Sequence, residues 1–83
     1  MASLRDVLNH IGRPVRIERD GVLVVEVKGI EKAGVALVEP KAEPLMGDTI
    51  RFLQTGKTAR VQSVAAEAIN GKIDHYRLGL EPA

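Results

Sequence analysis

Residues 14–28, PVRIERDGVLVVEVK, contain two alternating segments separated by a turn dipeptide. In Pro14–Arg19, Val15 and Ile17 alternate with Arg16 and Glu18, which is the period-two pattern of a half-buried strand. Asp20-Gly21 follows, and such a dipeptide is typical of a type I′ hairpin turn, because both central positions of that turn need a positive φ. Val22–Lys28 then alternates again. The stretch therefore predicts an antiparallel β-hairpin.

The second strand of this hairpin carries apolar residues on both faces. Leu23, Val25 and Val27 form one face, whereas Val22 and Val24 lie on the other. A strand that covers one side of a small core needs only one apolar face, so Val22 and Val24 are candidate contact residues for a protein partner. The sequence leaves open whether the N-terminal segment covers them, in which case they belong to the core.

Segments on either side of the hairpin extend this pattern. Ser3 and Asp6 form a capping pair, and apolar residues at helical spacing predict a short helix over Ser3–His10. Glycine, proline or asparagine marks each later break in the alternation, at Gly29–Gly34, 40–48, 55–57 and Asn70-Gly71. The predicted further strands are residues 35–39, 49–54, 58–68 and 72–80.

Six strands joined by short turns favour an antiparallel sheet, because parallel strands need long crossover connections. Closure of the sheet on itself buries one face and removes the exposed edges. We therefore predict a small six-stranded antiparallel β-barrel with one short N-terminal helix, forming a single domain over residues 1–83.

Composition argues against several classes of function. Twelve Lys and Arg against eleven Asp and Glu give a formal net charge of +1, and Phe52 and Tyr76 are the only aromatic residues, so we expect no nucleic-acid partner. The absence of cysteine favours a reducing, cytoplasmic location. Charged residues interrupt the first twenty positions, so we expect no membrane insertion.

Residues able to carry catalysis or bind metal are few. The only histidines, His10 and His75, have no second ligand at metal-binding spacing on the same element, and Asp74 beside His75 should point to the opposite face of its strand. Neither Ser3 nor Ser63 lies in a glycine-flanked nucleophile elbow. We therefore expect no catalytic residue, no metal and no cofactor.

Arg13, Arg16 and Arg19 are candidate ligand-binding residues, because guanidinium groups bind phosphates and carboxylates in forked geometry. On a strand, however, Arg13 and Arg19 share the core-facing side, and Arg16 points to the other side beside Glu18. The competing interpretation is a solvated strand whose charges simply alternate with core residues.

These arginines, together with Gly29–Gly34, Leu45–Ile50 and Tyr76–Leu80, resemble the PilZ domain over roughly residues 13–81. PilZ domains are six-stranded barrels in which an RxxxR motif and a D/N-x-S-x-x-G turn bind the second messenger cyclic di-GMP. The resemblance therefore implies a barrel fold and a role in bacterial signalling or motility.

This chain departs from both PilZ motifs. No two of its arginines are four positions apart. In the turn, Gly34 matches the glycine of the family, but Gly29 replaces the acidic or amide residue and Glu31 replaces the serine. A carboxylate at Glu31 would repel an anionic ligand where a hydroxyl should donate. The resemblance thus implies a degenerate PilZ-like barrel that does not bind cyclic di-GMP and acts as an adaptor for other proteins.

Two alternative functions stay open. The first is an Sm-like RNA-binding barrel, since a helix followed by Ile11–Ile17 and a bent hairpin resembles the start of that fold. The second is an atypical cyclic di-GMP receptor that uses Arg13, Arg16 or Arg19. The sequence specifies neither the protein partner nor whether the barrel self-associates.

Overall fold

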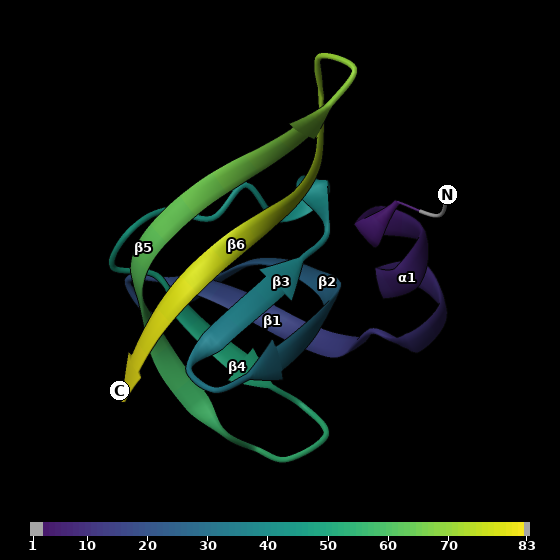
Figure 1. Cartoon of the computed structure of the whole chain (residues 1–83). Coiled ribbons are helices and arrows are strands. Elements are labelled where there is room, and N and C mark those ends of the chain that lie inside the picture. The colour runs from purple at the N-terminus through teal and green to yellow at the C-terminus, as the bar shows by residue number, and fades with distance from the viewer. Residues whose placement is uncertain (1–2, 83) are drawn as a thin grey trace.

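The structure, a computed structural model, describes residues 3–82. Its elements in chain order are α1 (Leu4–Ile11), β1 (Arg13–Arg19), β2 (Val22–Lys32), β3 (Val35–Val38), the 3-10 helix η1 (Pro40–Ala42), β4 (Thr49–Phe52), β5 (Thr58–Ile69) and β6 (Lys72–Pro82). All strand pairs are antiparallel, in the order β1-β2-β3-β6-β5-β4, and β4 returns to β1 to close a barrel (Figure 1). The predicted fold is confirmed.

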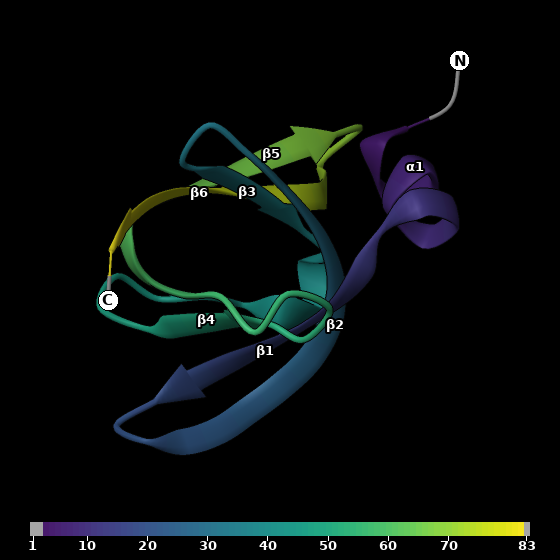
Figure 2. The ribbon, with the colours of Figure 1, turned by 90° about the horizontal axis from the view of Figure 1, so that it is seen from below.

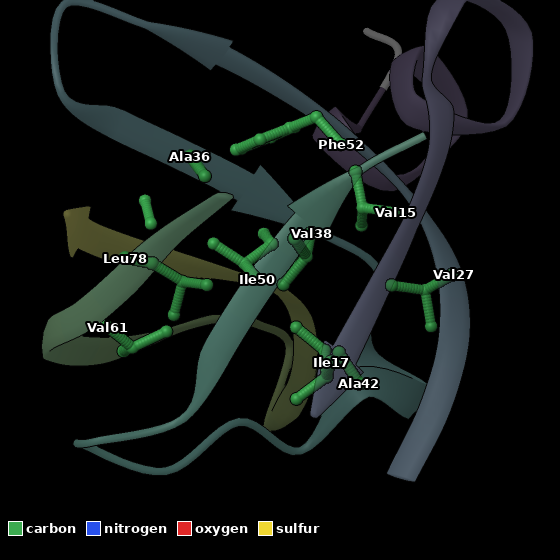
Figure 3. Close-up of a cluster of buried hydrophobic side chains, with 11 residues drawn as sticks. Val15, Ile17, Val27, Ala36, Val38, Ala42, Ile50, Phe52, Val61 and Leu78 are labelled. Carbon is green, nitrogen blue, oxygen red and sulfur yellow. The ribbon is translucent and has the colours of Figure 1, made fainter. Parts of the chain in front are cut away.

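Inward-facing side chains from all six strands fill the barrel. Closure is visible in the core itself, because Val15 and Ile17 of β1 lie opposite Phe52 and Ile50 of β4. The buried cluster consists of Val15, Ile17, Val27, Ala36, Val38, Ala42, Ile50, Phe52, Ala59, Val61 and Leu78 (Figure 3). Both aromatic residues belong to this region, since Tyr76 packs against the cluster that contains Phe52. The apolar surface of each strand is therefore buried only when the barrel closes.

Two hairpins extend beyond the closed part of the barrel. The connecting strands β3 and β4 have four residues each, whereas β2 and β6 have eleven and β5 has twelve. Consequently β2 pairs with β3 only over Gly29–Lys32, and β5 pairs with β4 only over Thr58–Arg60. The end of the β5–β6 hairpin lies on the side of α1, and the β1–β2 turn points away from α1 (Figure 2).

The predicted turn over Gly29–Gly34 is wrong in extent, because β2 continues to Lys32 and only Ala33 and Gly34 turn, with φ of 53° and 79°. Gly29 is instead buried in β2. A Cβ at this position would lie 3.0 Å from the Leu37 carbonyl oxygen. The glycine thus permits close approach of β2 and β3 where the barrel bends.

Two β-bulges correct the predicted strand faces. The register of β1 and β2 shifts between Ile17 and Glu18, so Leu23 is exposed and does not share the buried face of Val27. The register of β5 and β6 shifts between Val61 and Ser63, so Val64 packs against the core although strict alternation from Val61 would turn it to the outer face. An extra residue on one strand reverses the alternation beyond it, and no period-two pattern anticipates where this occurs.

Helix α1 forms as predicted and ends at Ile11. The Ser3 hydroxyl caps its first turn by accepting from the Asp6 amide at 3.2 Å. Leu8 is fully buried, and the helix packs against β2 and β6. The Asp74 carboxylate fixes this position, because it accepts from the Arg5 amide at 3.2 Å. Within residues 3–82 no helix has the length and apolar content needed to span a bilayer.

Candidate functional site

The structure does not bring the three candidate arginines together. Arg13 lines a shallow cleft near Gln54 at one end of β1. Arg16 lies on the outer face, where its Nε donates to Glu26 Oε1 at 3.1 Å, so its partner is not Glu18, which bonds Arg51 instead. Arg19 lies six residues from Arg13, a separation of about 20 Å along a strand. The three guanidinium groups therefore form no common ligand site.

Arg19 makes a structural ion pair with Asp48 in the turn before β4. Its Nε and Nη2 each lie 2.8 Å from one carboxylate oxygen, and the Leu45 amide donates to Asp48 Oδ2 at 2.8 Å. Burial alone would raise the pKa of Asp48, but the Arg19 hydrogen bonds and charge and the Leu45 amide outweigh it, so the pKa lies below its ordinary value. The hydrogen bonds that Arg19 donates to the Asp48 carboxylate raise the pKa of Arg19. This pair fixes the β1–β2 hairpin to residues 45–48.

The predicted motif-turn residues also lie apart. Gly29 is buried in β2, and Gly34 is in the turn that follows the strand. Glu31 faces the β4–β5 turn, where Lys57 Nζ donates to its carboxylate at 2.6 Å. The Glu31 carboxylate therefore has a cationic partner within the chain itself.

Asp74 and His75 are in contact, which corrects the expectation that they point apart. His75 Nδ1 lies 2.9 Å from Asp74 Oδ2, and both side chains are largely buried. Burial would raise the pKa of Asp74, but hydrogen bonds from His75, the Arg5 amide and Ser3 together lower it. The hydrogen bond that the Arg5 amide donates to Asp74 joins α1 to β6. Among residues 3–82 no three His, Cys, Asp or Glu side chains are grouped so as to hold a metal ion.

Acid should destabilise the fold through these two buried carboxylates. Because the pKa of Asp48 and of Asp74 is lower in the folded chain, each stabilises the fold above the ordinary carboxyl pKa, and this contribution is lost as the pH falls through the folded pKa. We expect urea-derived unfolding free energies to fall between about pH 5 and pH 2, and Asp48→Asn or Asp74→Asn to flatten that slope. Asp20→Asn, in an exposed turn that suits asparagine, is the matched control. An unchanged slope in both buried-site variants would contradict this assignment.

Three consecutive apolar side chains are exposed at the end of the β1–β2 hairpin. Val22, Leu23 and Val24 are 65%, 52% and 43% exposed, and we call them the hairpin patch. Helix α1 does not cover them, because it lies at the other end of this strand pair, where Lys28 Nζ donates to the Asn9 carbonyl. The question that the sequence left open is thereby answered: Val22 and Val24 are surface residues.

Two more exposed apolar residues lie in the turn that Arg19 holds against this hairpin. Leu45 and Met46 precede the Asp48 carboxylate and are 55% and 72% exposed. Sequence reasoning did not select them. The sequence signal for these two residues is an apolar pair between Pro44 and Gly47. In that loop no alternating pattern assigns the pair to a core.

A second apolar surface lies on the outer face of β3. Val35 and Leu37 point outward there, since Ala36 and Val38 occupy the core. With Leu4 of α1 and Ile30 of β2 they line a groove of about 380 Å³, which His75 and Arg77 border. The apolar side chains of β3 are thus divided between the core and this groove.

Comparison with known proteins gives one partial similarity. Residues 10–44 match the family model of the biotin protein ligase C terminal domain, which is less than half of the chain. The matched segment runs from the end of α1 through β1, β2, β3 and η1, so it contains the whole hairpin patch. No curated protein and no solved structure matches the chain. The chain is therefore a small barrel that resembles this C-terminal domain over its first half.

Proposed function

We propose that this chain is a non-catalytic protein-interaction module, an adaptor barrel that contacts its partner through the hairpin patch. The observation that carries the proposal is the exposure of Val22, Leu23 and Val24 together on one projecting hairpin. Soluble domains rarely expose contiguous apolar side chains unless a partner covers them. The adjoining Leu45 and Met46 enlarge the apolar surface available to such a partner.

The candidate ligand-binding residues lie apart in the structure, which favours a protein-interaction module over a nucleotide sensor. Arg16 and Arg19 are each paired with a carboxylate of the chain itself, and Glu31 is paired with Lys57. Because Arg16, Arg19 and Lys57 are already paired, they leave an anionic nucleotide less charge to compensate its desolvation. A PilZ-like adaptor in a cytoplasmic bacterial signalling or motility system is consistent with these features and is the specific form of the proposal.

The similarity to the biotin protein ligase C terminal domain points in the same direction. By its name, that domain is one part of a larger enzyme. The similarity supports an accessory role for this chain, in which it contacts another protein domain and catalyses no reaction of its own.

Val24→Asp should abolish partner capture while leaving the barrel folded. An exposed position tolerates a carboxylate in the free chain, but the same carboxylate buried against an apolar partner costs about 2 kcal/mol or more, which is over tenfold in affinity. The measurement is quantitative pull-down from source lysate with the full chain. Ile69→Asp is the matched control, because Ile69 is 50% exposed on the other hairpin. Circular dichroism should show both variants folded.

Two results would contradict the proposal. One is equal capture by Val24→Asp and the unsubstituted chain. The other is saturable calorimetric binding of cyclic di-GMP that Arg13→Ala or Arg16→Ala removes, which would favour a nucleotide receptor.

A further inference from the structure

The groove on the outer face of β3, which we call the outer groove, has the size and lining of a small-molecule site. Its floor is apolar and consists of partly buried side chains from three elements: Leu4, Ile30, Val35 and Leu37. Its volume of about 380 Å³ lies in the range of ligand pockets, which are mostly apolar and hold a few polar groups. The other lining residues are Glu31, Lys32, Glu67, His75 and Arg77.

The strand register places two cations on the same face as this apolar floor. Ile30 and Arg77 lie opposite Leu37 on its two neighbouring strands, and Lys32 lies opposite Val35. Directly opposed residues on neighbouring strands share one face of a sheet. Because β3 lies between β2 and β6, Lys32 and Arg77 flank the floor from its two sides (Figure 1).

These two cations have no ion-pair partner. Within residues 3–82 the ion pairs include neither Lys32 nor Arg77, and both residues are exposed. Glu31 is already paired inside the chain. Glu67 is the remaining carboxylate, and it lies opposite His75, at the end of the groove where α1 docks. The outer groove therefore has a cationic end at Lys32 and Arg77.

We propose that the outer groove binds a small molecule with an apolar body and a single carboxylate. The carboxylate lies between Arg77 and Lys32, because a guanidinium fork matches carboxylate geometry and charge. The apolar body lies along Leu37 and Ile30 towards Leu4. This site is separate from the hairpin patch, so the inference goes beyond the proposed function and does not depend on it.

Helix α1 forms one wall of this site, so a bound ligand should stabilise the docked helix. Leu4 lines the groove, and the next residue, Arg5, donates its amide to Asp74 Oδ2. His75 borders the groove and contacts the same carboxylate oxygen. A helix of eight residues is marginal alone in water, so α1 stays helical only while it is docked. A ligand that contacts Leu4 binds the docked form and shifts the equilibrium towards it.

Fluorescence titration of the full chain with anilinonaphthalene sulfonate tests the site. This probe has an aromatic body and one sulfonate, which stands in for the carboxylate. We expect saturable binding with a dissociation constant of about 10–100 µM, the strength that a ligand of this size reaches. Arg77→Gln should raise this constant at least about fivefold, because it removes a charge-assisted hydrogen bond. Naphthoate, which carries a true carboxylate, should displace the probe.

Matched controls separate the charge from the apolar contact. Arg60→Gln should stay within about twofold, because Arg60 is an exposed arginine of β5 that does not line the groove. Neutral N-phenylnaphthylamine should bind the unsubstituted chain and Arg77→Gln equally. Leu37→Ala should weaken both probes at least about fivefold, since it removes part of the floor. If Leu37→Ala does not fold by circular dichroism, Leu4→Ala replaces it.

Amide exchange tests the coupling to α1 independently. Saturation with naphthoate should slow exchange of the Gly12 amide, which donates to the Leu8 carbonyl at the end of α1. Exchange of the Asn70 amide, in the β5–β6 turn, should not change.

Three results would overturn the proposal. The first is the absence of saturable probe binding up to about 1 mM. The second is equal weakening by Arg77→Gln and Arg60→Gln. The third is loss of probe binding in Val24→Asp, which would place the probe on the hairpin patch and leave the adaptor function standing.

Discussion

Leu78→Ala is expected to lower the free energy of unfolding by about 3 kcal/mol, within the range of about 2–5 kcal/mol for leucine truncation in a packed core. Leu78 is fully buried at the centre of β6, opposite Ala36 of β3 and Val64 of β5. Truncation leaves a cavity that three strands line, and the rigid barrel can collapse onto it only in part. A domain of this size has a free energy of unfolding of about 5–10 kcal/mol, so Leu78→Ala removes a large share of the stability.

Urea unfolding followed by circular dichroism measures this effect. Leu45→Ala is the matched control, since Leu45 is exposed and its truncation should change stability by less than about 0.5 kcal/mol. A loss below about 1 kcal/mol for Leu78→Ala would show that β6 does not close the core as described.

Gly29→Val should lower the free energy of unfolding by about 2 kcal/mol or more. A Cβ at this position would lie 3.0 Å from the Leu37 carbonyl oxygen and 3.0 Å from Val38 Cγ1, and valine adds two methyl groups beyond it. The carbonyl belongs to the backbone of β3, so relief requires the two strands to separate. The predicted result is a lower urea midpoint with an unchanged m-value.

Ile30→Val at the next position is the control for Gly29→Val. Ile30 points outward and is only partly buried, so loss of one methylene should cost about 1 kcal/mol at most. Equal effects at the two positions would mean that β2 and β3 do not approach closely at Gly29. The comparison also distinguishes a packing glycine from the ligand-motif position that the PilZ resemblance suggested.

Local patterns were sufficient to predict the barrel. The hairpin dipeptides Asp20-Gly21 and Asn70-Gly71 turn where expected, with positive φ at all four residues. Alternation identified all six strands, because each strand buries one face and exposes the other. The capping serine of α1 was also predictable from the sequence, because its hydrogen bond joins residues only three positions apart in the chain.

The candidate site was only partly predictable. Val22 and Val24 were selected because apolar residues on the second face of a strand are unusual. Leu23 was placed on the buried face, since the bulge that exposes it arises from pairing between two strands. The partners of Arg16, Arg19 and Glu31 could not be predicted, because they lie 10 to 29 residues away in the chain.

By itself the sequence determined the secondary structure, the turns and the antiparallel barrel, because these follow from periodicity and from interactions between near neighbours. Only the tertiary structure decided what remains exposed. The short β3 and β4 leave one edge of β2 unpaired, and α1 packs at the far end of the hairpin. Exposure depends on which strands end first and where a helix docks, and these are properties of the assembled chain that no single segment encodes.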